Sequence, residues 1–179
     1  CIISDGGGAI VVTSAERARD LRKTPVSILG SSEAVQHQGT GYNDLLTIAA
    51  KQSGEVAFGQ AGVSREDIDL AMIYDSFTIT VLATLENLGF CEPGEGGDFV
   101  SNAGIALGSK LPVNPDGGGM SSNHPGMRGI FLVIEAVKQL RNECEARQVS
   151  GAEIALAHGT GGTIGDKHSG ATLILGIDR

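Results

Sequence analysis

The chain has 179 residues, and 41% of them are hydrophobic, so it can bury a core of its own and is not intrinsically disordered. Its 13 basic and 21 acidic residues give a net charge of −8, which disfavours nucleic acid or an anionic membrane as a partner. Three cysteines, no membrane-length apolar run and no signal-peptide pattern predict a soluble protein of a reducing compartment, the cytoplasm.

The first elements alternate between strand and helix. Residues 8–13 are an apolar, β-branched run and residues 14–21 are good helix formers, so we expect a strand followed by a helix. Pro25 ends that helix, and residues 26–30 predict a second strand. Apolar positions between 44 and about 59 fit a helix.

The same alternation continues through the middle of the chain. Ser64 to Asp67 has the pattern of a capping turn, and residues 70–74 predict a buried strand. A helix is expected over 79–88, with Gly89 at its C-terminal cap. Residues 89–125 hold many turn residues and predict a long loop region with at most one short hairpin.

The last third predicts one buried helix over 126–141 and two strands, 154–157 and 171–175, with a glycine-rich stretch between them. Strands that alternate with helices predict an α/β fold with a layered sheet. Glycine is unusually common, at 27 of 179 residues against a usual share of roughly 7%. Many of these glycines fall in the loops that also carry polar side chains.

His124 is the most informative polar residue. Pro125 suits the first position of the following helix, so we expect His124 at a helix N-terminus, where a neutral imidazole can donate to a negative oxygen. The alternative is a capping or loop-tying histidine.

His158 ends a predicted strand just before a run of glycines. It is suited to act as a general base near neutral pH, and a structural histidine explains the position equally well. Tyr74 and Asp75 end another strand, and capping of the next helix by Asp75 or Ser76 explains them adequately.

The cysteines show no metal-ligand spacing, so we expect no metal site. Cys91 and Cys144 are expected to be inert. His37 and His168 have no partner that the sequence reveals.

Three segments together resemble the thiolase superfamily, in particular the branch of sterol carrier protein x thiolases and lipid-transfer-protein aldolases. The most specific element is Asn-Pro-Asp-Gly-Gly-Gly at 114–119 followed by His-Pro-Gly at 124–126, which resembles the family's asparagine, glycine-pair and Gly-His-Pro signature. Tyr-Asp-Ser-Phe at 74–77 occupies the place of its Asn-Glu-Ala-Phe loop. His-Gly-Thr-Gly at 158–161 occupies that of its Cys-x-Gly loop.

The resemblance implies a βαβαβαββ half with helices on both faces of a mixed sheet. Residues 1–24 would be the last strand and helix of an N-terminal half, and residues 25–179 the C-terminal thiolase-like domain. It also implies a homodimer or tetramer formed through the N-terminal half. The substrate would be an acyl-CoA, a coenzyme A thioester, with no covalently bound cofactor.

Carried over by position, His124 would stabilise an enolate oxygen, Tyr74 would replace a water-holding asparagine, and His158 would replace an acid/base cysteine. Asn123, Gly118, Gly119 and Gly161 fall in the same motifs and are expected to bind substrate. Asn123 stands where the family has glycine, and both family cysteines are absent, so conventional thiolase proton transfer is in doubt.

Two mechanisms fit the resemblance. In the first, which is the preferred interpretation of the sequence, the intact protein is an acyl-CoA C-acyltransferase in which His158 is the base and the nucleophilic cysteine lies outside these residues. In the second it is a retro-aldolase that acts on a 3-hydroxyacyl-CoA, for example one with a steroid side chain. Tyr74 would then move a hydroxyl proton, and a small OB-fold and zinc-ribbon protein is the usual partner. A non-catalytic acyl-CoA or lipid carrier is the third possibility.

Overall fold

The computed structural model describes residues 1–37, 45–162 and 167–177. Its helices are α1 (Ala15–Ala18), α2 (Ala49–Ala61), α3 (Thr78–Leu88), α4 (Gly96–Asp98) and α5 (Gly129–Leu140). Its strands are β1 (Val26–His37), β2 (Leu70–Ile73), β3 (Ile154–Gly162) and β4 (Lys167–Ile177). Single turns of 3₁₀ helix lie at Arg65–Asp67 and Glu145–Arg147, and single π turns at Phe99–Ala103 and Gly118–Ser122.

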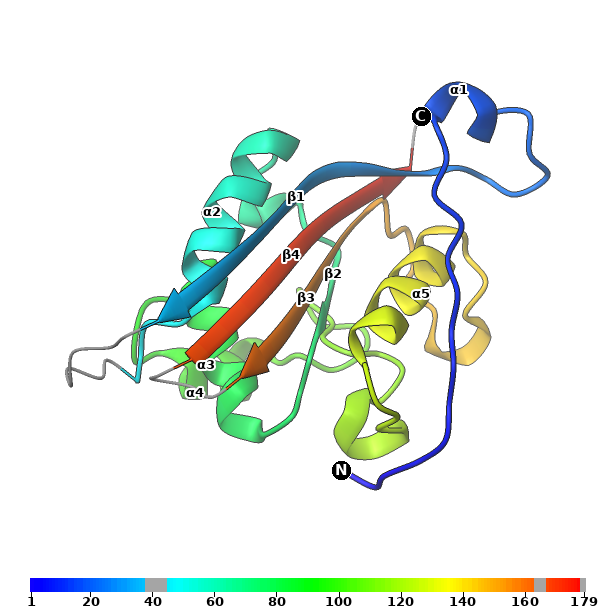
Figure 1. Cartoon of the computed structure of the whole chain (residues 1–179). Coiled ribbons are helices and arrows are strands. Elements are labelled where there is room, and N and C mark those ends of the chain that lie inside the picture. The colour runs from blue at the N-terminus through cyan, green and yellow to red at the C-terminus, as the bar shows by residue number, and fades with distance from the viewer. Residues whose placement is uncertain (38–44, 163–166, 178–179) are drawn as a thin grey trace.

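The four strands form one mixed sheet in the order β1-β4-β3-β2 (Figure 1). β4 runs antiparallel to both β1 and β3, whereas β2 and β3 are parallel. This arrangement confirms the α/β class and the mixed sheet. It also places the end of β2 beside the middle of β3, with Ile73 opposite His158.

Helices cover both faces of the sheet, with α2 and α3 on one side and α5 on the other (Figure 1). Successive side chains of a strand point to opposite faces, and β2 shows this clearly. Leu70 and Met72 are buried against α5, and Ala71 and Ile73 are buried in the core under α2 and α3. Side chains at neighbouring strand ends can therefore lie on different faces of the sheet.

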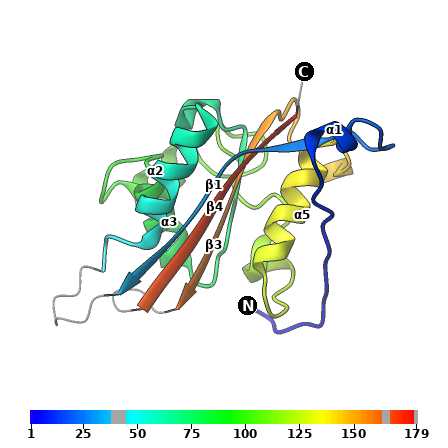
Figure 2. The same ribbon diagram turned by 45° about the horizontal axis from the view of Figure 1, so that its top comes forward.

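The N-terminal segment, residues 1–13, runs alongside α5 (Figures 1 and 2). A Cβ added at Gly8 would lie 2.5 Å from Cδ1 of Ile134, which shows how closely the two pack. Residues 8–13 form no strand here, because a strand needs a neighbour to exchange backbone hydrogen bonds and this segment lies against a helix. The helix expected after it is only the four residues of α1.

Several expected elements are confirmed. A capping box joins Ser64 and Asp67, and α3 ends at Gly89, whose φ of +82° is the left-handed conformation that glycine adopts without strain. Three strands are longer than expected, since β1 continues to His37 and β3 and β4 continue into the glycine-rich stretch. Residues 89–125 form short helical turns and no hairpin.

The expected helix between 44 and 59 begins at Ala49, and residue 44 itself lies outside the described residues. In the ranges that the structure describes, every helix is too short or too polar to cross a membrane.

Candidate active site

Tyr74 and His124 form a hydrogen-bonded pair at the carboxyl end of β2. The Tyr74 hydroxyl oxygen lies 2.9 Å from Nε2 of His124, and the two rings stack with centroids 5.7 Å apart. Tyr74 directly follows β2, whereas His124 lies fifty residues later, so the fold brings them together. Both side chains are half-buried, which leaves the pair partly accessible.

His124 does not lie at a helix N-terminus, contrary to the expectation from Pro125. α5 begins at Gly129, and Met127 has a φ of +61°, which turns the chain before the helix starts. The histidine is held instead by the N-terminal segment: its backbone N–H donates to Oγ of Ser4 at 3.1 Å, and it forms an isolated β-bridge with Ile3. Its chemistry therefore depends on Tyr74 and not on a helix dipole.

Asp75 does not cap α3, and neither does Ser76. The N-cap of α3 is Phe77, which makes no side-chain cap. The Asp75 carboxylate, 4% exposed, accepts backbone N–H groups from Gly119 at 2.7 Å and Met120 at 3.1 Å. The residue after Tyr74 thus holds the loop that leads to His124.

Gly118 and Gly119 leave room for this carboxylate. Gly118 has a φ of +64°, and a Cβ there would come within 2.2 Å of an Asp75 carboxylate oxygen. Both glycine amides are already occupied, because the N–H of Gly118 donates to Asp116 at 3.0 Å and that of Gly119 to Asp75. In this structure these two expected substrate-binding residues shape the loop, and their N–H groups point to carboxylates.

Asn123, also expected to bind substrate, is held by a buried arginine. Arg128, 3% exposed, donates to Oδ1 of Asn123 at 3.0 Å and forms an ion pair with Asp116 at 2.7 Å. It therefore ties together both ends of the loop before His124. Sequence reasoning gives no ground for selecting Arg128, because a lone arginine at the start of a helix is usually exposed to solvent.

Asn114 fixes the same loop to β2. Its side-chain amide donates to the carbonyl of Ile73 and accepts the N–H of Ile73, both at 2.8 Å. The side chain thereby takes both backbone hydrogen bonds of Ile73, the residue before Tyr74, as a neighbouring strand would. The asparagine of the 114–119 motif thus anchors the loop beside the pair through the backbone of β2.

His158 lies on the other face of the sheet, under α2. Its Nδ1 is 2.8 Å from the hydroxyl of Thr172, which is 2.9 Å from the hydroxyl of Ser53 in α2. The side chain is completely buried, and burial together with His168 lowers the pKa of His158 to about 4. The backbone N–H of Tyr74 donates to the carbonyl of His158 at 2.9 Å, but the side chain of His158 does not meet those of Tyr74 and His124.

The other expected residues are also away from the pair. Gly161 pairs with Ser169 in the β3–β4 ladder. His168 is buried, and its Nδ1 accepts the N–H of Ala49 at 3.3 Å. The side chain of His37 lies outside the described residues.

Two of the three cysteines are poor nucleophiles. Burial and neighbouring glutamates raise the pKa of Cys91 to about 11, and burial with Glu135 raises that of Cys144 to about 12. Cys1 is exposed, and its sulfur lies 3.8 Å from the carbonyl oxygen of Asp75. Among the residues with described positions, no three His, Cys, Asp or Glu side chains are grouped to hold a metal ion.

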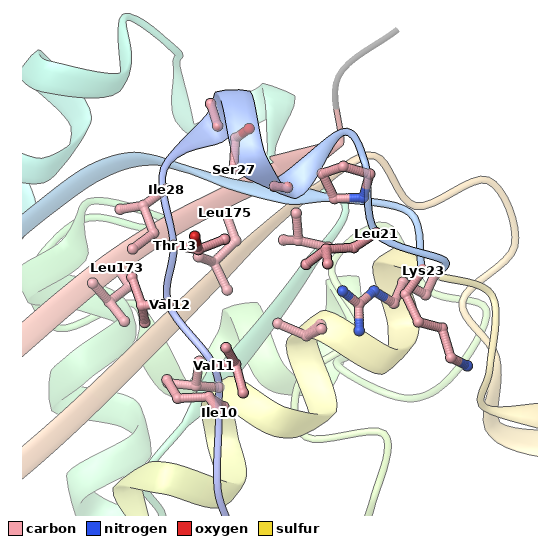
Figure 3. Close-up of a pocket in the computed structure, with 17 residues that line it drawn as sticks. Ile10, Val11, Val12, Thr13, Leu21, Lys23, Ser27, Ile28, Leu173 and Leu175 are labelled. Atoms are coloured by element: carbon pink, nitrogen blue, oxygen red, sulfur yellow. The ribbon is translucent and has the colours of Figure 1, made fainter.

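An apolar groove of about 370 Å³ lies elsewhere, between the N-terminal segment, the start of β1 and the outer face of α5. Figure 3 shows Ile10, Val11 and Val12 on one side of it and Leu173 and Leu175 of β4 on the other. Tyr74 and His124 are not among its lining residues. The groove and the polar pair are therefore separate features.

Known proteins resemble this chain along nearly its whole length. A steroid side-chain-cleaving aldolase of Thermomonospora curvata is 37% identical over an alignment of 190 positions, which covers 100% of this chain and 45% of the relative. An acetyl-CoA acetyltransferase of Methanothermobacter thermautotrophicus is 39% identical over 169 residues, covering 91% of this chain and 43% of the relative. This chain thus spans less than half the length of these relatives.

The fold is similar to that of a solved structure, the Ltp2-ChsH2(DUF35) aldolase. The TM-score is 0.80 at 33% identity, and the match covers 92% of this chain and 43% of that one. The sequence profile described as "Thiolase C-terminal domain-like" matches residues 30–177. The chain belongs to the family of thiolase C-terminal-like domains, within the branch of the superfamily that contains the sterol carrier proteins and the aldolases.

Proposed function

We propose that this chain is the C-terminal half of a thiolase-like enzyme that cleaves the bond between the α and β carbons of a 3-hydroxyacyl-CoA by a retro-aldol reaction. The observation that carries the proposal is the hydrogen bond of 2.9 Å between the Tyr74 hydroxyl and Nε2 of His124. A phenol that is hydrogen-bonded to an imidazole can receive a proton from a substrate hydroxyl and pass its own proton to the imidazole. The retro-aldol step requires this transfer.

The proton path runs from the substrate's 3-hydroxyl through Tyr74 to His124. With the ring proton of His124 on Nδ1, its Nε2 accepts the Tyr74 O–H. The Tyr74 oxygen then takes the proton of the substrate's 3-hydroxyl as its own proton moves to Nε2. The α–β bond breaks, the β carbon leaves as a ketone or aldehyde, and the electron pair forms the enolate of the shorter acyl-CoA.

The same pair completes the reaction. The imidazolium formed on His124 places a positive charge beside the enolate, which stabilises it electrostatically. Return of the proton through Tyr74 to the α carbon gives the shorter acyl-CoA and restores both side chains. No acyl group is attached to the protein in this sequence of steps, so no nucleophilic thiol is needed.

The acyltransferase mechanism that the sequence favours depends on His158 as base. His158 is completely buried, faces α2, and has its pKa lowered to about 4 by burial and His168. This placement supports the retro-aldol reaction over the acyltransferase reaction. The acyltransferase reaction is a second candidate, because one relative is an acetyl-CoA acetyltransferase. The nucleophile for that reaction would lie outside these residues.

The test is an assay of the protein at its natural length with two substrates. We expect cleavage of a 3-hydroxyacyl-CoA, with a steroid CoA thioester carrying a tertiary hydroxyl as one probe because a relative is a steroid side-chain-cleaving aldolase. Tyr74→Phe removes the hydroxyl and keeps the ring. It should lower kcat by about 100-fold or more, the usual effect of losing a general acid/base group, with little change in KM.

Ser76→Ala is the matched control, since it removes a hydroxyl from the same turn that bonds only weakly to Thr80 at 3.4 Å. Its kcat should stay within threefold of wild type. Normal turnover by Tyr74→Phe would show that the pair is not catalytic. Thiolysis of a 3-ketoacyl-CoA without any retro-aldol cleavage would establish the acyltransferase instead.

A further inference from the structure

We propose that Asp75 is a positioning residue that fixes His124 against Tyr74, an inference that rests on the proposed function of this pair. Asp75 is joined to Tyr74 by a peptide bond, and its buried carboxylate holds the backbone of Gly119 and Met120. Gly119 in turn lies against the His124 ring, because a Cβ added there would be 2.9 Å from Cδ2 of the imidazole. These contacts form a closed ring that runs from Tyr74 through Asp75, Gly119 and His124 back to Tyr74.

The charge of Asp75 suits this task. A carboxylate accepts hydrogen bonds at both oxygens, and here each oxygen takes one backbone N–H of the π turn Gly118–Ser122. Bonds from N–H groups to a charged acceptor are stronger than those to a neutral one. A neutral amide of the same shape offers one acceptor oxygen, so the second N–H would face another donor.

Gly119 couples the position of the Asp75 carboxylate to that of the His124 imidazole. With no side chain at 119, the ring of His124 packs directly on the backbone that Asp75 holds. A shift of the turn therefore shifts the ring relative to the Tyr74 hydroxyl. Reactions that depend on aligned groups can lose about 100-fold in rate for a displacement of roughly 1 Å.

The experiment uses three variants of the protein at its natural length. Asp75→Asn removes the charge. Gly119→Ala keeps the charge of Asp75 but adds a methyl group 2.9 Å from Cδ2 of His124 and 3.0 Å from Oδ1 of Asp75. Gly126→Ala is the matched control in the same loop, since a Cβ there meets nothing within 4 Å. For each variant, kcat and KM are measured on 3-hydroxyacyl-CoA, and a crystal structure gives the distance from Tyr74 Oη to His124 Nε2.

We expect Asp75→Asn and Gly119→Ala to lower kcat at least tenfold with KM within threefold of wild type, and to lengthen the hydroxyl-to-imidazole distance beyond hydrogen bonding. Gly126→Ala should match wild type in both measurements. Wild-type kcat, or an unchanged distance, in both test variants would overturn the inference. If Asp75→Asn fails to fold, Gly119→Ala alone decides.

The two proposals fail separately. If the wild-type protein cleaves no 3-hydroxyacyl-CoA while both variants displace His124, the proposed function is wrong and the positioning role stands. If the wild-type protein is active and the variants are too, the proposed function stands and the positioning role is wrong.

Discussion

His124 and His158 occur in similar local sequences, each beside glycine or proline, but their surroundings differ completely. His124 is half-buried beside a tyrosine hydroxyl, whereas His158 is enclosed between the sheet and α2. Nε2 of His158 has no hydrogen-bond partner among the described residues, and its Nδ1 is next to Thr172. A buried imidazole with one unpartnered nitrogen resists protonation, since the charged form would lack solvation.

This environment predicts a pH dependence of folding stability. His158 has a pKa of about 4 when folded, lowered from the ordinary histidine value of 6.5 by burial and by His168. Between these values the unfolded chain binds the proton more tightly, so stability is highest above pH 6.5 and falls as the pH drops to 4. The difference amounts to about 3 kcal/mol from this residue. Urea unfolding of the 179-residue chain at several pH values measures it.

His158→Asn is the variant that tests this assignment, because the asparagine oxygen can keep the contact with Thr172 and cannot titrate. The variant starts from a lower stability, but its loss between pH 6.5 and 4 should be smaller than that of the wild-type chain. Parallel curves for the two proteins would contradict the assignment. Burial also lowers the pKa of His168, which therefore contributes in the same direction in both.

Among the elements, α5 has two apolar sides with different surroundings. Leu132, Ala136 and Leu140 are buried against β2, β3 and β4. Val133 and Val137 are half-buried and line the groove beside the N-terminal segment. The helix is therefore packed fully on one side only.

Alanine substitutions on the two sides should differ in cost. Leu132→Ala removes a side chain that is 1% exposed and should lower the free energy of unfolding by roughly 2–5 kcal/mol. Val137→Ala removes less, from a side that is open to the groove, and should cost at most about 1 kcal/mol. Urea unfolding of both variants measures this, and equal losses would mean that both sides of α5 are packed equally.

As a whole, the molecule exposes apolar side chains along its N-terminal segment. Ile3 and Val11 are each 90% exposed and Val12 is 70% exposed, and Val11 and Val12 line the groove in Figure 3. Contiguous exposed apolar surface usually marks a site of contact with other protein. The relatives, more than twice as long as this chain, have additional sequence that can make such a contact.

The 179-residue chain alone should therefore bind a hydrophobic dye such as ANS. It should be catalytically silent on 3-hydroxyacyl-CoA and 3-ketoacyl-CoA, because under the proposed function it is only the C-terminal half of the enzyme. Paired Val11→Ser and Val12→Ser substitutions should reduce the dye fluorescence, because both residues line the groove. Fluorescence titration and the two activity assays measure these outcomes. Turnover by the chain alone, at the rate of the natural-length protein, would show that this half contains a complete site.

The sequence by itself determined the fold class and the elements with clear periodicity, and it predicted Tyr74 and His124 as site residues. β2, α3 with its Gly89 cap, and the turn at Ser64 follow from local patterns of burial and capping, which act over a few residues. Three short motifs that resemble those of thiolases identify the family in the same way, from residues close together in the chain. Residues 8–13 are misleading, since a β-branched run forms a strand only beside another strand.

Tertiary structure alone decided which side chains meet. Tyr74 follows β2 and His158 lies within the neighbouring strand β3, yet the alternation of side chains along each strand puts one under α5 and the other under α2. Asp75 has the local pattern of a helix cap, but its partners are amides more than forty residues away. Contacts of that separation depend on how the sheet and loops pack, and no short stretch of sequence contains that information.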